Sequence, residues 1–60
     1  MLSTDQAASI RGVIAQEQDS VAFYGELLKT EKRKPWRVRY RALKKKHAGY
    51  IKRWREELKG

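Results

Sequence analysis

The sequence predicts an all-α protein, a two-helix antiparallel hairpin that dimerises into a four-helix bundle. Three observations predict this fold: two stretches in which apolar residues recur at spacings of three and four, one proline between them, and no strand-like alternation. With 60 residues the chain is at most one domain, so residues 1–60 are expected to form a single helical hairpin. It contains no cysteine, so neither a disulfide nor a thiolate zinc site can reinforce a small core.

The first helix is expected over residues 4–31. Ser3 and Gln6 have the spacing of a capping box, in which each side chain bonds the backbone N–H of the other residue. One broad face of the following segment is apolar. Glu17 occupies the position on this face, between Ile14 and Val21, where the spacing of three and four would place an apolar residue. Its apolar members are Ala7, Ile10, Val13, Ile14, Val21, Tyr24, Leu27 and Leu28. Two glycines weaken this helix, and a break near Asp19 into two shorter helices is the alternative.

The second helix is expected over residues 36–58, after a basic turn at residues 32–35. Pro35 fits the first turn of a helix, because an N–H in that position has no intrahelical partner. At 100° per residue, one arc of roughly 100° then contains Trp36, Tyr40, Leu43, His47, Tyr50, Ile51, Trp54 and Leu58. Most of the aromatic residues in this arc, Trp54 included, are expected in the core. Trp36, beside the basic turn, is the candidate for partial exposure.

The two apolar faces are wider than a single hairpin can cover. Below about 70–80 residues a lone hydrophobic core is thin, and exposed apolar patches of this kind favour association. A homodimer that closes as a four-helix bundle is therefore expected. The alternative is a hairpin whose apolar face binds another protein.

The positive charge is concentrated in the second half of the chain. Residues 1–30 contain two basic and four acidic residues, whereas residues 31–60 contain thirteen basic and three acidic residues. Between Lys32 and Arg55 there are twelve positive charges and no negative one. This asymmetry indicates a polyanionic partner.

The expected function is non-enzymatic binding of nucleic-acid phosphates, in DNA or RNA, through the basic face of residues 32–55. The candidate binding residues are Lys32, Arg33, Lys34, Arg37, Arg41, Lys44, Lys45, Lys52 and Arg55. Trp36 is the candidate aromatic contact. Four of the basic residues lie outside the apolar arc, so packing is expected not to depend on their charge; they are Arg37, Arg41, Lys44 and Lys45.

Other functions are weighed against this one. The chain can instead be a protein-interaction module, an inhibitor or adaptor that docks on an acidic surface of a larger protein. A membrane-surface helix is disfavoured because the first helix covers the apolar residues of the second. No enzyme is expected, since the sequence has no phosphate loop, metal cluster or nucleophile–base pair at a recognisable spacing. The N-terminus has no basic segment followed by an apolar run, so a cytoplasmic location is expected.

Glu17 and His47 lie within the two apolar faces, and a turn near residue 33 brings them within about one helical turn of each other. The expected role is a buried, hydrogen-bonded pair that fixes the register of the helices. Together with Tyr24 and Ala48, this spacing resembles half of a ferritin-like helix pair. That family has a glutamate three residues before its histidine, where this chain has Lys44, so no metal or cofactor is expected.

Overall fold

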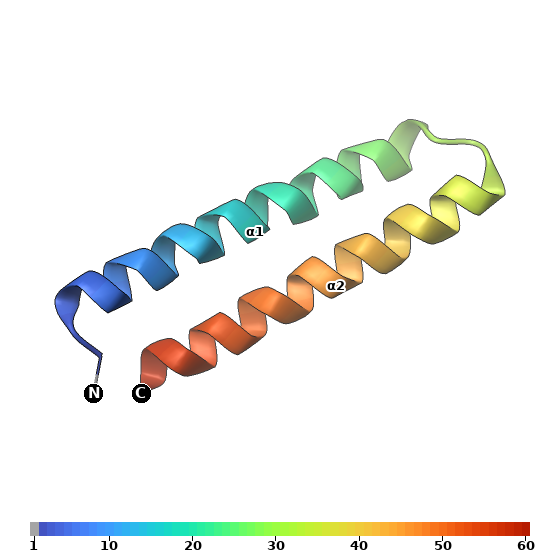
Figure 1. The fold of residues 1–60 in the computed structure, drawn as a ribbon. Coiled ribbons are helices and arrows are strands. Elements are labelled where there is room, and N and C mark those ends of the chain that lie inside the picture. The colour runs from blue at the N-terminus through green and yellow to red at the C-terminus, as the bar shows by residue number, and fades with distance from the viewer. Residues whose placement is uncertain (1) are drawn as a thin grey trace.

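Two antiparallel helices make up the hairpin. The computed structural model describes residues 2–60 and contains α1 (Thr4–Thr30) and α2 (Lys34–Lys59). The helices lie side by side and are joined by a turn at residues 31–33 (Figure 1). No strand occurs within residues 2–60. The prediction of an all-α helical hairpin is therefore confirmed for the single chain.

Helix α1 begins with the predicted capping box. The Ser3 hydroxyl accepts the backbone N–H of Gln6 at 3.1 Å, and the Gln6 side-chain oxygen accepts the N–H of Ser3 at 2.9 Å. The helix is continuous through Asp19, so the alternative of two shorter helices is excluded. It ends at Thr30, one residue before the expected end, and the N–H of Glu31 closes its last turn on the carbonyl of Leu27 at 2.9 Å.

Helix α2 begins at Lys34, two residues earlier than expected. Pro35 lies in the first turn, where a missing N–H breaks no hydrogen bond, so the helix can include the residue before the proline. No side chain caps this N-terminus, because Arg33 occupies the N-cap position and has no side-chain acceptor. The connecting turn is accordingly shorter than the four residues expected.

The register of the two helices is symmetric about Lys32. The Tyr24 and Tyr40 rings, eight residues on either side of it, are stacked with their centroids 6.2 Å apart. Glu17 and His47, fifteen residues on either side, are also in contact. A short turn therefore determines which residues of α1 face which residues of α2.

The core of the single hairpin is thin. Ile14, 8% exposed, is the one buried side chain among the described residues, and the other apolar residues that face the partner helix are half-buried. The Cα trace extends over 46 × 14 × 10 Å and has a radius of gyration of 14.1 Å, against about 10 Å for a compact chain of this length. The hairpin exposes 4987 Å², whereas a compact protein of 7.1 kDa exposes about 4,100 Å². A single copy thus exposes about 900 Å² more than its mass requires.

The assignment of Trp54 to the core is wrong for the single hairpin, since its side chain is 37% exposed. One neighbouring helix covers less than the full apolar arc of α2, and Trp54 is one of the residues that it leaves partly exposed. Trp36 is 39% exposed, in line with its expected partial exposure. Phe23 and Val38 are the most exposed large apolar residues, at 58% and 55%.

Candidate functional site

The basic residues of α2 and the turn have few acidic partners. Of the twelve cations between Lys32 and Arg55, Arg33 alone has a carboxylate within 4 Å in the described part of the chain, that of Glu31. Two further lysine–glutamate pairs lie within single helices, Lys29–Glu26 at 3.0 Å and Lys59–Glu56 at 3.7 Å. Most of the positive charge in residues 32–55 is therefore not neutralised by the chain itself.

Arg33 is paired within the turn. Its Nε donates to Glu31 Oε1 at 2.5 Å, and its Nη2 donates to Glu31 Oε2 at 3.3 Å. The hydrogen bond from Arg33 lowers the pKa of Glu31, and the same hydrogen bond raises the pKa of Arg33. Of the predicted binding residues, Arg33 is thus the one whose charge already has a partner.

Arg37 has a structural role that the sequence did not predict. Its Nη1 donates to the backbone oxygens of Leu28 at 2.6 Å and Glu31 at 2.8 Å. These carbonyls belong to the C-terminal end of α1, where the last turn leaves oxygens without an intrahelical donor and where a cation is favoured. The expectation that packing does not depend on Arg37 is therefore wrong, because the half-buried guanidinium reaches back across the turn.

Lys44 is also drawn toward α1. Its side chain is half-buried, and its Nζ lies 3.5 Å from the place that a Cβ on Gly25 would occupy. The missing side chain at Gly25 leaves room for the aliphatic stem of Lys44 to lie along α1, as long cationic side chains commonly do. Lys44 therefore contributes both packing and charge.

Five of the exposed cations of α2 form a single row, which we term the cationic stripe. Its members follow one another at intervals of seven, four, seven and three residues, which places them within about 80° of the helix circumference. They are Lys34, Arg41, Lys45, Lys52 and Arg55, and all are exposed. The row spans about 32 Å at 1.5 Å per residue, and the exposed Lys32 lies near one end of it.

Trp36 lies next to the basic turn, in the first turn of α2. The guanidinium carbons of Arg33 and Arg39 are 5.6 Å and 5.1 Å from the centroid of its ring, within cation–π range. Its ring also lies 5.9 Å from that of Tyr40. Arg39 was not among the predicted site residues, although its spacing of three from Trp36 could have identified it.

Glu17 and His47 meet at the helix interface. His47 Nδ1 hydrogen-bonds with Glu17 Oε2, and the two side chains are 23% and 20% exposed, so the pair is half-buried rather than fully buried. The ring of Tyr24 stacks on His47 at 5.7 Å, and Tyr50 meets the imidazole edge-on at 5.6 Å. Within residues 2–60 no third metal-ligating side chain joins them. The pair is a side-chain contact between the two helices in an aromatic surrounding.

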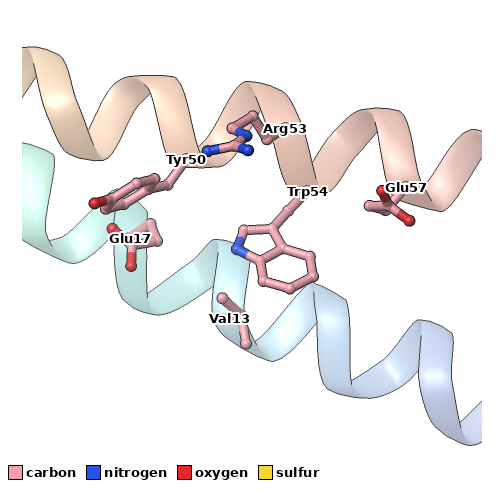
Figure 2. A pocket seen from close by; sticks show the side chains of 6 residues that line it. All are labelled: Val13, Glu17, Tyr50, Arg53, Trp54 and Glu57. Carbon is pink, nitrogen blue, oxygen red and sulfur yellow. The ribbon is translucent and has the colours of Figure 1, made fainter.

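An open groove of about 750 Å³ runs between the two helices next to this pair. Figure 2 shows Trp54 pointing from α2 toward Val13 on α1. The groove has an aromatic and aliphatic centre and a charged rim, and its lining residues are Val13, Glu17, Tyr50, Arg53, Trp54 and Glu57. It is separate from the cationic stripe, since none of the stripe residues lines it.

No protein-family model, curated protein or solved structure matches the chain at a significant level. Neither of the two helices, as far as the chain is described, has a stretch long and apolar enough to cross a bilayer. The function is therefore inferred from the chemistry of the surfaces described above.

Proposed function

We propose that this protein is a non-enzymatic binding protein that contacts nucleic-acid phosphates through the cationic stripe. One observation carries the proposal: five exposed cations in one row about 32 Å long, with no carboxylate within 4 Å in the described chain. Cations at neighbouring positions on a helix repel one another, so the stripe alone destabilises α2. A row of phosphates removes that repulsion and releases its own condensed counterions.

The chemistry of the stripe favours binding without base selection. Lysine and arginine on an exposed helix surface contact phosphates, which position a protein on nucleic acid but carry no sequence information. Trp36, partly exposed and near the guanidinium groups of Arg33 and Arg39, adds one ring on which an unpaired base can stack. We therefore expect similar affinity for different sequences and a strong dependence on salt.

Self-association into a four-helix bundle is a second part of the proposal. The support is the thin core and the excess of about 900 Å² of exposed surface on a single hairpin. Two hairpins that share one core bury apolar residues that one hairpin leaves half-exposed. Such a dimer presents two cationic stripes to one nucleic acid.

Docking on an acidic protein is the alternative that a specific residue favours. Val38 is 55% exposed and lies four residues after Lys34 and three before Arg41, so it adjoins the stripe on the helix surface. An apolar side chain among cations is a common feature of protein–protein contacts and adds nothing to phosphate binding. A partner held through Val38 stays bound after nuclease treatment, whereas a nucleic acid does not.

Two matched triple variants test phosphate binding. The first replaces Arg41, Lys45 and Arg55 with Gln and removes three charges from the stripe. The second replaces Arg11, Lys29 and Lys46 with Gln and removes the same number of charges from other exposed positions. Fluorescence anisotropy of labelled single-stranded and duplex DNA and RNA, titrated over a range of salt concentrations, gives the salt slope for each.

The stripe variant is expected to lose about 0.9 from the log–log salt slope per phosphate contact on duplex DNA, and about 0.7 on single strands. The control variant keeps a slope close to that of the parent. Equal binding by the parent and the stripe variant at every salt concentration would rule out phosphate contacts by these residues. Equal losses in both variants would show that net charge, and not the stripe, attracts the nucleic acid.

A further inference from the structure

We infer that the groove at Val13, Tyr50 and Trp54 is the surface on which a second copy of this chain docks. The inference rests on the proposed self-association and adds which face of the hairpin forms the interface. The groove contains the exposed indole of α2 and an open volume of about 750 Å³ that no other side chain of the hairpin fills. Figure 2 shows this indole extending from α2 into the space between the two helices.

The exposed area fits one partner of the same size. A hairpin exposes about 900 Å² more than a compact protein of its mass, and a standard stable interface covers about 800 Å² on each partner. A small ligand covers far less than this. The surface that the isolated hairpin leaves exposed is thus of the size that a second copy covers.

The composition of the groove is that of an interface centre. Tryptophan and tyrosine are enriched where interfaces are fully desolvated, and the exposed charges belong at the rim. Here Trp54, Tyr50 and Val13 are the apolar centre, while Arg53 and Glu57 are exposed at the edge. Leaving Trp54 37% exposed forgoes part of the free energy that burial of a large aromatic ring contributes.

The charges select the second copy over a polyanion. Glu17 and Glu57 line the groove, so phosphates or an acidic surface are repelled from it. Arg53 lies in the same lining, and a surface that carries both signs can pair with itself about a two-fold axis. The cationic stripe, which has one sign, repels its own copy and stays outside the interface.

This arrangement is compatible with phosphate binding. At 100° per residue, Tyr50 and Trp54 lie on one side of α2, and the stripe begins about 100° away from Trp54. A dimer closed through the groove therefore leaves both stripes exposed. Loss of the dimer and loss of phosphate binding can then be observed separately.

A matched pair of valine variants tests the inference. Val13→Glu places a carboxylate in the groove, and Val38→Glu makes the same change at an apolar residue on α2 that does not line it. Sedimentation equilibrium over micromolar concentrations gives the dimer dissociation constant of each. We expect Val13→Glu to raise it by at least about tenfold and Val38→Glu to change it by less than about twofold.

A second measurement covers the case in which circular dichroism shows that Val13→Glu has unfolded. Trp36→Phe leaves Trp54 as the single tryptophan of the chain. Its emission is expected to shift to shorter wavelength, and its quenching by acrylamide to fall, as the protein is concentrated and the indole is covered. An emission maximum that does not change while the protein dimerises overturns the inference.

The remaining outcomes separate the two proposals. A parent protein that stays monomeric at every concentration overturns both self-association and the groove interface, while the anisotropy titrations still decide phosphate binding. A parent dimer that Val38→Glu dissociates and Val13→Glu leaves intact overturns the groove alone.

Discussion

Nη1 of Arg37, in the first turn of α2, donates a hydrogen bond of 2.6 Å to the backbone oxygen of Leu28, in the last turn of α1. The same nitrogen donates to the oxygen of Glu31 at 2.8 Å. A residue that belongs by sequence to the basic face thus stabilises the end of the other helix. The Arg37 guanidinium thus contributes to the fold, whereas the cations of the cationic stripe have no carboxylate within 4 Å in the described chain.

We predict that Arg37→Gln lowers the free energy of unfolding by about 1–2 kcal/mol. Hydrogen bonds from charged groups contribute about 1.5–3 kcal/mol, and the half-exposed position of this guanidinium reduces that contribution. Urea denaturation followed by circular dichroism measures the change. Arg41→Gln is the control, expected within about 0.5 kcal/mol of the parent because its side chain is exposed. All variants are compared at one protein concentration, since association changes apparent stability.

A double-mutant cycle on Glu17 and His47 is expected to show coupling. Each single change to Ala leaves the other polar group half-buried without its partner, which costs about 1–3 kcal/mol. The double change removes both groups and is expected to cost less than the sum of the two, by about 0.5–3 kcal/mol. Additive single effects, measured by the same denaturation experiment, would show that the contact contributes no energy to the fold.

The pairing of Glu31 with Arg33 predicts a pH dependence. The pKa of Glu31 is lowered in the folded chain, mainly by the Arg33 hydrogen bond, so the ionised carboxylate stabilises the turn. That contribution is complete above the unfolded pKa of about 4.5 and is lost as the pH falls through the lower folded pKa. Glu31→Gln is therefore expected to be less stable than the parent at neutral pH, with the difference vanishing in acid.

Thermal unfolding from neutral to strongly acidic pH measures this difference. Arg33→Gln serves as the matched control, because it removes the donor and is expected to abolish the same portion of the pH dependence. A stability difference between the parent and Glu31→Gln that stays constant down to acid pH contradicts the assignment.

Two glycines offer a gain in stability. Gly12 and Gly49 lie within α1 and α2, and a Cβ at either position would have no neighbouring atom within 4 Å. Alanine restricts the unfolded chain without a clash, so each change to Ala is expected to add about 0.5–1 kcal/mol to the free energy of unfolding. Neither added Cβ would have a neighbour within 4 Å, so the two changes share no contact and the double variant is expected to show the sum. A lower melting temperature in either single variant contradicts the prediction.

Local signals in the sequence predicted most of the hairpin. Ser3 and Gln6 marked the start of α1, Pro35 marked the start of α2, and the apolar spacing predicted the inner faces. The contact between Glu17 and His47 followed from the position of the turn, because each residue of a short hairpin has one position opposite it. These features depend on neighbours in the chain or on simple register.

Two features were not predicted from the sequence. One depends on how far a long side chain extends across the turn, and the other on how much of α2 is in contact with α1. The bonds of Arg37 depend on the path of a three-residue turn, which brings the carbonyls of Leu28 and Glu31 within reach of α2. The exposure of Trp54 depends on how much of an apolar arc one neighbouring helix covers. A helical wheel shows the direction in which a side chain points, but not what fraction of that side chain the neighbouring helix buries.

The three-residue turn also has a consequence for how the chain folds. Its two helices face each other in order of their distance from Lys32, so contacts near the turn close short loops and those at the open end close long ones. Contacts between the helices are therefore expected to form first at the Tyr24–Tyr40 stack and then, one after another, toward Ile14. Backbone amides at the end of the hairpin away from the turn are then expected to open first and to exchange with solvent fastest. The basic turn, where Arg37 bonds the carbonyls of Leu28 and Glu31, is expected to open last.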